Sequence, residues 1–160
     1  MPKPVSPDRL DGVASSGSAR AACQAATPAE LEQALARALV TGGLRRIPRN
    51  PQHRDLVLAV VCLTLQRRRP YPEPVLNEHL RARLATLKAT VDHVTCRRYL
   101  VDLGFLKRDR AGSRYFLNYP RLASTLSEEA AAALDSILQR LLDRGGRHAE
   151  GLVSVRRGDV

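Results

Sequence analysis

Basic side chains gather in two short stretches that suit contact with a polyanion. Arg97 and Arg98 are adjacent in a stretch of helical periodicity, and a predicted hairpin follows them. The guanidinium fork of arginine pairs with phosphate oxygens and with the guanine edge in the DNA major groove. Thr95 is a short polar candidate beside these arginines. The candidate set for nucleic-acid contact is Thr95, Arg97, Arg98, Lys107, Arg108, Arg110 and Arg114.

The positive charge belongs to one segment of the chain. Of 160 residues, 26 are Lys or Arg and 16 are Asp or Glu, a net charge of +10. Residues 45–121 hold 17 basic and 6 acidic residues, which leaves 9 basic and 10 acidic residues elsewhere. This excess favours double-stranded DNA as the partner, although charge alone does not separate DNA from structured RNA. A general preference for arginine is the alternative, since lysine occurs only three times.

Three helices are predicted inside residues 45–121. Residues 52–66 are apolar throughout their middle, which predicts a helix buried on several sides, although the β-branched residues leave a strand possible. Residues 72–84 and 93–103 have the spacing of a second and a third helix. In the third helix the predicted core face is Cys96, Tyr99, Leu100 and Leu103, and the predicted outer face is Val94, Arg97, Arg98 and Val101.

A β-hairpin is predicted after the third helix. Gly104 is placed to end that helix, and residues 105–108 and 113–117 read as strands around a turn that contains Gly112. Three helices followed by a hairpin is the order of a winged helix-turn-helix. In such proteins the third helix enters the major groove and the hairpin, the wing, contacts the DNA backbone or the minor groove.

One amphipathic helix is predicted on each side of this core. The first covers residues 27–43 and starts with Thr27 as its cap, and the second covers residues 124–145 and ends at Gly145–Gly146. Their apolar stripes predict packing on the core or on a second protomer, so a homodimer through the flanking helices is one hypothesis. For the N-terminal helix, packing within the chain is favoured. Residues 1–26 are predicted to be a disordered arm and residues 146–160 a flexible tail.

Residues 49–118 resemble a bacterial family, domain-of-unknown-function family twenty-eighty-seven. The resemblance rests on the motifs Tyr71-Pro72-Glu73, Val75-Leu76-Asn77, Asp92-His93-Val94-Thr95, Arg97-Arg98-Tyr99-Leu100-Val101-Asp102, Gly104-Phe105-Leu106, Arg108 and Gly112-Ser113-Arg114-Tyr115. Members of this family occur alone or fused to ArsR-type transcriptional regulators. The resemblance implies a winged-helix-like regulator module and implies no ligand and no catalytic residue.

The sequence offers little for catalysis, metal binding or membrane insertion. It lacks the nucleophile-elbow, Walker A, zincin and dinucleotide-binding motifs, so we expect no enzyme. His93 and Cys96 are three residues apart, but no CxxC pair accompanies them, so neither a metal nor another cofactor is expected. No apolar run is long enough to cross a membrane. The N-terminal residues lack the apolar region of a signal peptide, so a cytoplasmic protein is expected.

These observations predict a mainly α protein, with a winged helix-turn-helix core and one flanking helix on each side, that acts as a DNA-binding transcriptional regulator. One alternative is a winged-helix protein-interaction module without nucleic-acid binding, with Val94 and Val101 as its contact stripe. Arg97 or Arg98 could instead form an ion pair with Asp92 or Asp102. Two aromatic residues, Tyr71 and Tyr115, could stack on single-stranded bases, but closing the core is favoured.

Overall fold

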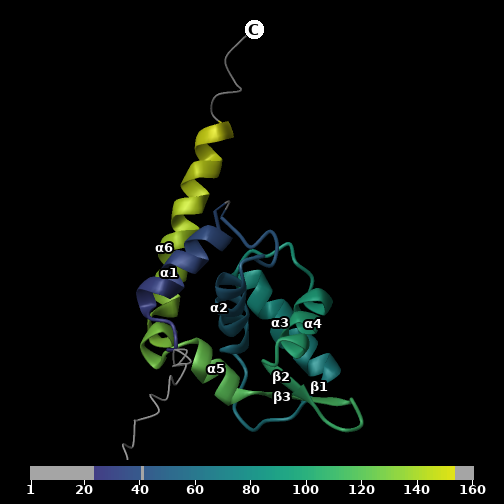
Figure 1. Ribbon diagram of the computed structural model, residues 1–160. Helices are drawn as coiled ribbons and strands as arrows, with labels where there is room; N and C mark the ends of the chain where they lie inside the picture. Colours follow the sequence, from purple (N-terminus) through teal and green to yellow (C-terminus); the bar gives the residue numbers. More distant parts are fainter. Residues whose placement is uncertain (1–23, 41, 154–160) are drawn as a thin grey trace, which may run out of the picture.

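The computed structural model describes residues 24–40 and 42–153, which form six helices and one three-stranded antiparallel sheet. The sheet lies at one end of α2, α3 and α4, and α1 lies beside α6 (Figure 1). None of these helices is both long and apolar enough to cross a membrane. The elements are α1 (Pro28–Ala38), α2 (Pro51–Cys62), β1 (Tyr71–Pro72), α3 (Glu73–Thr86), α4 (His93–Asp102), β2 (Leu106–Arg108), β3 (Arg114–Leu117), α5 (Tyr119–Thr125) and α6 (Glu128–Val153).

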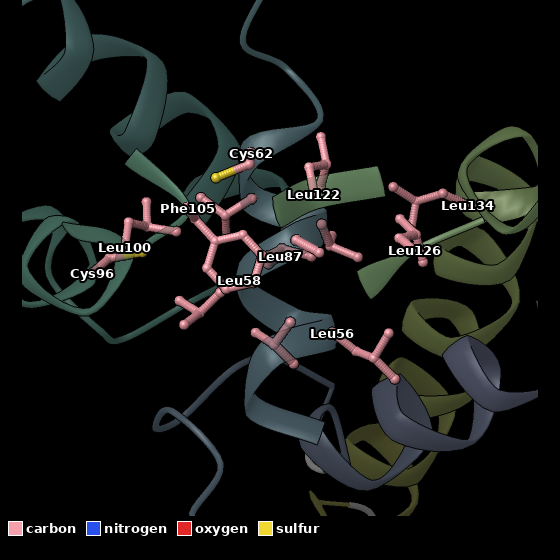
Figure 2. Close-up of a cluster of buried hydrophobic side chains, with 14 of the residues drawn as sticks. Leu56, Leu58, Cys62, Leu87, Cys96, Leu100, Phe105, Leu122, Leu126 and Leu134 are labelled. Atoms are coloured by element: carbon pink, nitrogen blue, oxygen red, sulfur yellow. The ribbon is translucent and has the colours of Figure 1, made fainter. Parts of the chain in front are cut away.

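Helix α2 forms the centre of the core. It begins after Asn50, whose side-chain oxygen accepts the backbone N–H of His53 at 3.1 Å. Residues 56–62 are all buried, and α1, α3, α4 and α5 pack around them. Figure 2 shows side chains of α2 meeting Phe105 and Leu122 from later parts of the chain. The prediction of a helix buried on several sides is therefore confirmed, although the helix ends at Cys62 and not at residue 66.

The second and third predicted helices are confirmed as α3 and α4. Leu80 of α3 and Leu100 of α4 are among the apolar side chains that the two helices contribute to the core. Arg83, on the apolar side of α3, is also buried, and its Nε donates to the carbonyl of Val60 at 3.2 Å. Helix α4 ends where Gly104 adopts a φ of +78°, a left-handed conformation that glycine accommodates without strain.

The predicted hairpin is present, and an unpredicted strand joins it. Strands β2 and β3 pair in register, with Leu106 opposite Leu117. The two-residue strand β1 pairs with the other edge of β3, which gives the sheet order β1-β3-β2. Tyr71 lies opposite Tyr115 in this pairing, and both rings are buried. The alternative in which these tyrosines close the core is therefore the one that the structure bears out.

The flanking helices α1 and α6 pack on each other, and α1 also packs on α2. The Thr27 hydroxyl accepts the backbone N–H of Glu30, whose carboxylate accepts the Thr27 N–H at 2.8 Å, so the predicted cap is present. The apolar stripes of α1 and α6 are both buried within the chain. These stripes are therefore occupied and offer no apolar surface for a second protomer. The stripes consist of Leu31, Ala34, Leu35 and Leu39, and of Ala130, Leu134, Ile137, Leu138 and Leu141.

The predicted N-terminal arm and the region before α6 need two corrections. Residues 1–23 lie outside the described residues, but Ala26 is buried and forms a parallel bridge with Leu126. The arm is thus fixed at its end by pairing with a segment a hundred residues away. Helix α5, which was not predicted, follows β3 directly and buries Leu122 against α2.

The expected end of the last helix at Gly145–Gly146 is wrong, because α6 continues to Val153. Part of the predicted tail is therefore helical, and residues 154–160 lie outside the described residues. Glycine inside a helix costs about 1 kcal/mol relative to alanine, which packing elsewhere can offset. Packing explains why glycine is present at position 145, since a Cβ there would lie 2.4 Å from the Cα of Gly42. This glycine permits a close approach between α6 and the loop after α1.

This close approach leads to a prediction for Gly145→Ala. Alanine would improve helix propensity by about 1 kcal/mol. The new methyl group would force the Gly42 backbone to move, and such overpacking costs about 1–3 kcal/mol. We therefore expect a net loss of about 1 kcal/mol in the free energy of unfolding, measured by urea denaturation. Ser136→Ala, at an exposed position of α6, is the control and should change stability little. A gain in stability for Gly145→Ala would contradict the close approach.

Candidate nucleic-acid interface

Helix α4 starts with a side-chain cap that uses one of the candidate residues. The carboxylate of Asp92 accepts the backbone N–H of Thr95 at 2.8 Å and its hydroxyl at 2.7 Å. These two bonds hold the pKa of Asp92 below its usual value. The hydroxyl of Thr95 is therefore already used to fix the start of α4, although the residue is exposed.

Arg97 does not point outward as predicted. Its guanidinium pairs with Glu73 of α3 at 2.9 Å and donates to the side-chain oxygen of Asn77, and its side chain is only 15% exposed. It also lies over the ring of Tyr115, 5.8 Å from the ring centre. Its partner is thus neither Asp92 nor Asp102, because position 97 lies on the side of α4 that faces the first turn of α3. Arg97 joins α4 to α3 and to the sheet.

Arg98, its neighbour, lies on the outer face of α4 and is exposed. No ion pair or hydrogen bond joins its side chain to another described residue. Tyr99, expected in the core, is 39% exposed, whereas Val101, expected outside, is half-buried against the core. The buried stripe is centred on Cys96 and Leu100, so Tyr99 stands beyond its edge. The outer face of α4 consists of Val94, Thr95, Arg98, Tyr99 and Asp102.

The turn of the hairpin is held by Asp109. Its carboxylate accepts the backbone N–H groups of Ser113 at 2.8 Å and Arg114 at 3.2 Å, and the Ser113 hydroxyl at 3.1 Å. The backbone bond from Arg114 is the main reason why the pKa of Asp109 lies below its usual value, and the bonds from Ser113 add to it. Gly112 supplies a φ of +71°, as expected for this turn.

The four basic residues of the hairpin are exposed but differ in what they contact. Arg108 donates to the Gly112 carbonyl at 3.1 Å and lies over the Tyr115 ring, 5.3 Å from its centre. The side chains of Lys107, Arg110 and Arg114 form no hydrogen bond or ion pair with another described residue. Because alternate residues of a strand face opposite sides, Lys107 lies on the other face of the sheet from Arg108. The hairpin therefore presents positive charge on both faces and at its tip.

A shallow hollow of about 210 Å³ separates the outer part of α4 from the hairpin. It brings three of the predicted residues together, Arg97, Arg98 and Arg108, and two carboxylates from Glu73 and Asp102 also line it. The remaining predicted residues lie at the start of α4 and along the hairpin. Tyr99 is the exposed aromatic residue that the sequence analysis missed, because its spacing fits the apolar stripe of α4.

The cysteines of the described residues behave as small hydrophobic side chains. Cys62 and Cys96 are both buried, and burial raises the pKa of Cys96 to about 12 and that of Cys62 further. Both are therefore protonated thiols at neutral pH, as is usual for structural buried cysteines. Nowhere in residues 24–40 and 42–153 do three or more His, Cys, Asp or Glu side chains form a group that could hold a metal ion. Cys23 lies outside these residues.

Comparison with known proteins identifies the central segment. Residues 43–117 match the family DUF2087, described as an uncharacterized protein conserved in bacteria. The resemblance seen in the sequence is therefore confirmed over this segment, which spans α2 to β3. No curated protein and no solved structure matches the chain significantly.

The contacts of Arg97 lead to a stability prediction that separates it from Arg98. Arg97→Ala removes a partly buried ion pair and leaves Asn77 and Glu73 without their donor, so we expect a loss of about 1–3 kcal/mol in the free energy of unfolding. Arg98→Ala, the matched control one residue away, should change stability by less than about 0.5 kcal/mol. Urea denaturation of both variants measures the difference. Equal effects would contradict the assignment of Arg97 as a structural residue.

The cap of the hairpin turn leads to a prediction of pH dependence. The pKa of Asp109 is lower in the folded chain than in the unfolded chain, so its contribution to stability is present above the unfolded value, near 3.9. The contribution is lost as the pH falls through the folded value. We expect the backbone amide signals of Ser113 and Arg114 to shift together in an acid NMR titration, with a midpoint below the usual Asp value. In Asp109→Asn this shared transition should disappear, and its persistence would contradict the cap.

Proposed function

We propose that residues 45–121 form a winged helix that binds duplex DNA and that the chain is a bacterial transcriptional regulator. The element order α2-β1-α3-α4-β2-β3 supports the fold. In winged helices a short strand before the second helix pairs with the returning strand of the hairpin, as β1 pairs with β3 here. This pairing adds to the order of three helices and a hairpin on which the hypothesis first rested.

Helix α4 takes the role of the recognition helix in this proposal. An α-helix fits into the major groove of B-DNA and reads the base edges with side chains of its exposed face. Arg98 is the side chain of that face with a free guanidinium for phosphate or guanine. Val94 offers an apolar contact for a thymine methyl group. Arg97, by contrast, is a positioning residue, because its ion pair with Glu73 fixes α4 against α3.

The hairpin supplies the backbone contacts, and its charge is the observation that carries the proposal. Lys107, Arg110 and Arg114 are exposed on the hairpin, without partners among the described residues. Unpaired guanidinium and ammonium groups of this kind neutralise phosphates and release counterions, which is the main source of affinity in many DNA complexes. The carboxylate of Asp109 is bonded to backbone N–H groups and forms no ion pair with these side chains, so it offsets only one of the hairpin's four positive charges.

A second candidate function is a protein-interaction module. Val94 and Tyr99 are 37% and 39% exposed on the outer face of α4, and exposed aromatic residues are enriched at protein interfaces. Val101 is half-buried against the core and is therefore not part of the predicted contact stripe. A homodimer through the flanking helices would need a surface other than their apolar stripes, which lie within the chain. The DNA-binding function would place the protein in the cytoplasm, where the chromosome lies.

The DNA proposal is tested with the full chain and a mixed-sequence duplex, by fluorescence anisotropy across a salt series. We expect log affinity to fall linearly with log salt. Arg110→Ala should weaken binding to all sequences alike and lower the salt slope by about one, since it removes a single phosphate contact. Arg98→Ala should also alter which sequences bind best, because Arg98 lies on the helix that reads the bases.

Two outcomes would contradict the proposal. One is that the wild type fails to bind duplex DNA even at low salt. The other is that Arg110→Ala changes the sequence preference and leaves the salt slope unaltered. Val94→Asp serves as the test of the second candidate. If it disrupts a complex with another protein while duplex binding stays intact, the protein-interaction function gains support.

A further inference from the structure

A second basic surface lies at the other end of α2. A hollow of about 520 Å³ opens between the end of α1, the loop after it and the first turn of α2. We call it the basic hollow. None of its described lining residues is acidic. It is lined by Arg37, Ala38, Val40, Arg45, Arg46, Pro48, Arg49, Asn50 and His53.

The positive charge of this hollow is not neutralised by acidic residues of its lining. The side chains of Arg37, Arg46 and Arg49 are exposed and form no ion pair or hydrogen bond with another described residue. The closest carboxylate of α2, Asp55, is already shared between Arg54 at 3.0 Å and Arg121 at 2.7 Å. Several guanidinium groups around one concave space create a strong positive potential there. Such a potential favours the binding of an anion.

The walls of the hollow are fixed by hydrogen bonds, so the site exists before a ligand binds. Leu44 is buried, and its N–H donates to the carbonyl of Leu87 at 3.1 Å while its own carbonyl accepts the N–H of Thr90 at 2.9 Å. The Thr90 hydroxyl donates to the carbonyl of Arg45 at 3.0 Å. On the far side, Asn50 caps α2. A preformed site loses less conformational entropy on binding than a mobile loop does.

We propose that the basic hollow binds a small ligand that carries phosphate groups. Arginine forks suit phosphate oxygens, and the volume lies in the range of small-molecule sites. The hollow is lined by the start of α2. Helix α2 is about 18 Å long at 1.5 Å per residue, and the sheet lies at its other end (Figure 1). The inference goes beyond DNA binding and does not depend on it.

The test is calorimetric titration of the full chain with inorganic pyrophosphate in a phosphate-free buffer. We expect saturable binding of one pyrophosphate per chain. The double variant Arg46→Gln/Arg49→Gln should lose at least about tenfold in affinity, because each charged hydrogen bond contributes more than 1 kcal/mol. Arg98→Gln/Arg110→Gln is the matched control, since it removes the same two charges at the other basic surface, and its affinity should stay within about twofold.

Three results would overturn the proposal. Wild type without saturable binding at millimolar pyrophosphate would exclude the site, and equal losses in both double variants would mean that only net charge matters. If the wild type does not bind pyrophosphate but Arg46→Gln/Arg49→Gln weakens duplex DNA binding, the hollow is part of a nucleic-acid-binding surface instead. Arg37→Gln, on a different element, repeats the test should the loop variant fold poorly. Failure of DNA binding alone would overturn the proposed function and leave this inference intact.

Discussion

The burial of α2 on all sides is the constraint on which the other parts of the structure depend. Residues 56–62 are completely buried, so this part of α2 has no polar face exposed to solvent. A helix of this kind is stable only if other elements surround it. Helices α3 and α4 pack against α2, and so do the flanking helix α1 and the short helix α5. Buried apolar area contributes about 25 cal/mol per Å², so removing either flank would expose a costly surface.

This dependence explains which elements could be predicted from the sequence. The start of α1 follows from Thr27 and Glu30, and the hairpin turn follows from Gly112, because these signals are local. Strand β1 could not be predicted, because it exists only through the pairing of Tyr71 with Tyr115, which is distant in the sequence. Gly145 misled the prediction for α6 for the same reason. Its role, to admit Gly42, is visible only in three dimensions.

The candidate site was predictable in its charge but not in its geometry. Sequence located the basic residues of α4 and the hairpin, and the structure places Arg98 and the hairpin residues at the surface. It could not say that Arg97 would be tied to Glu73, because that depends on how α3 lies against α4. Adjacent positions of a helix differ by about 100°, so two neighbouring arginines reach different surroundings. Tyr99 shows the same limit at the edge of an apolar stripe.

The two basic surfaces are far apart but share a hydrogen-bonded connection. The loop that forms one wall of the basic hollow is bonded through Leu44 and Arg45 to the segment between α3 and α4. Thr90, which makes two of these bonds, stands two residues before Asp92, the cap of α4. These hydrogen bonds therefore position the wall of the basic hollow and the segment that leads into α4 as one connected unit.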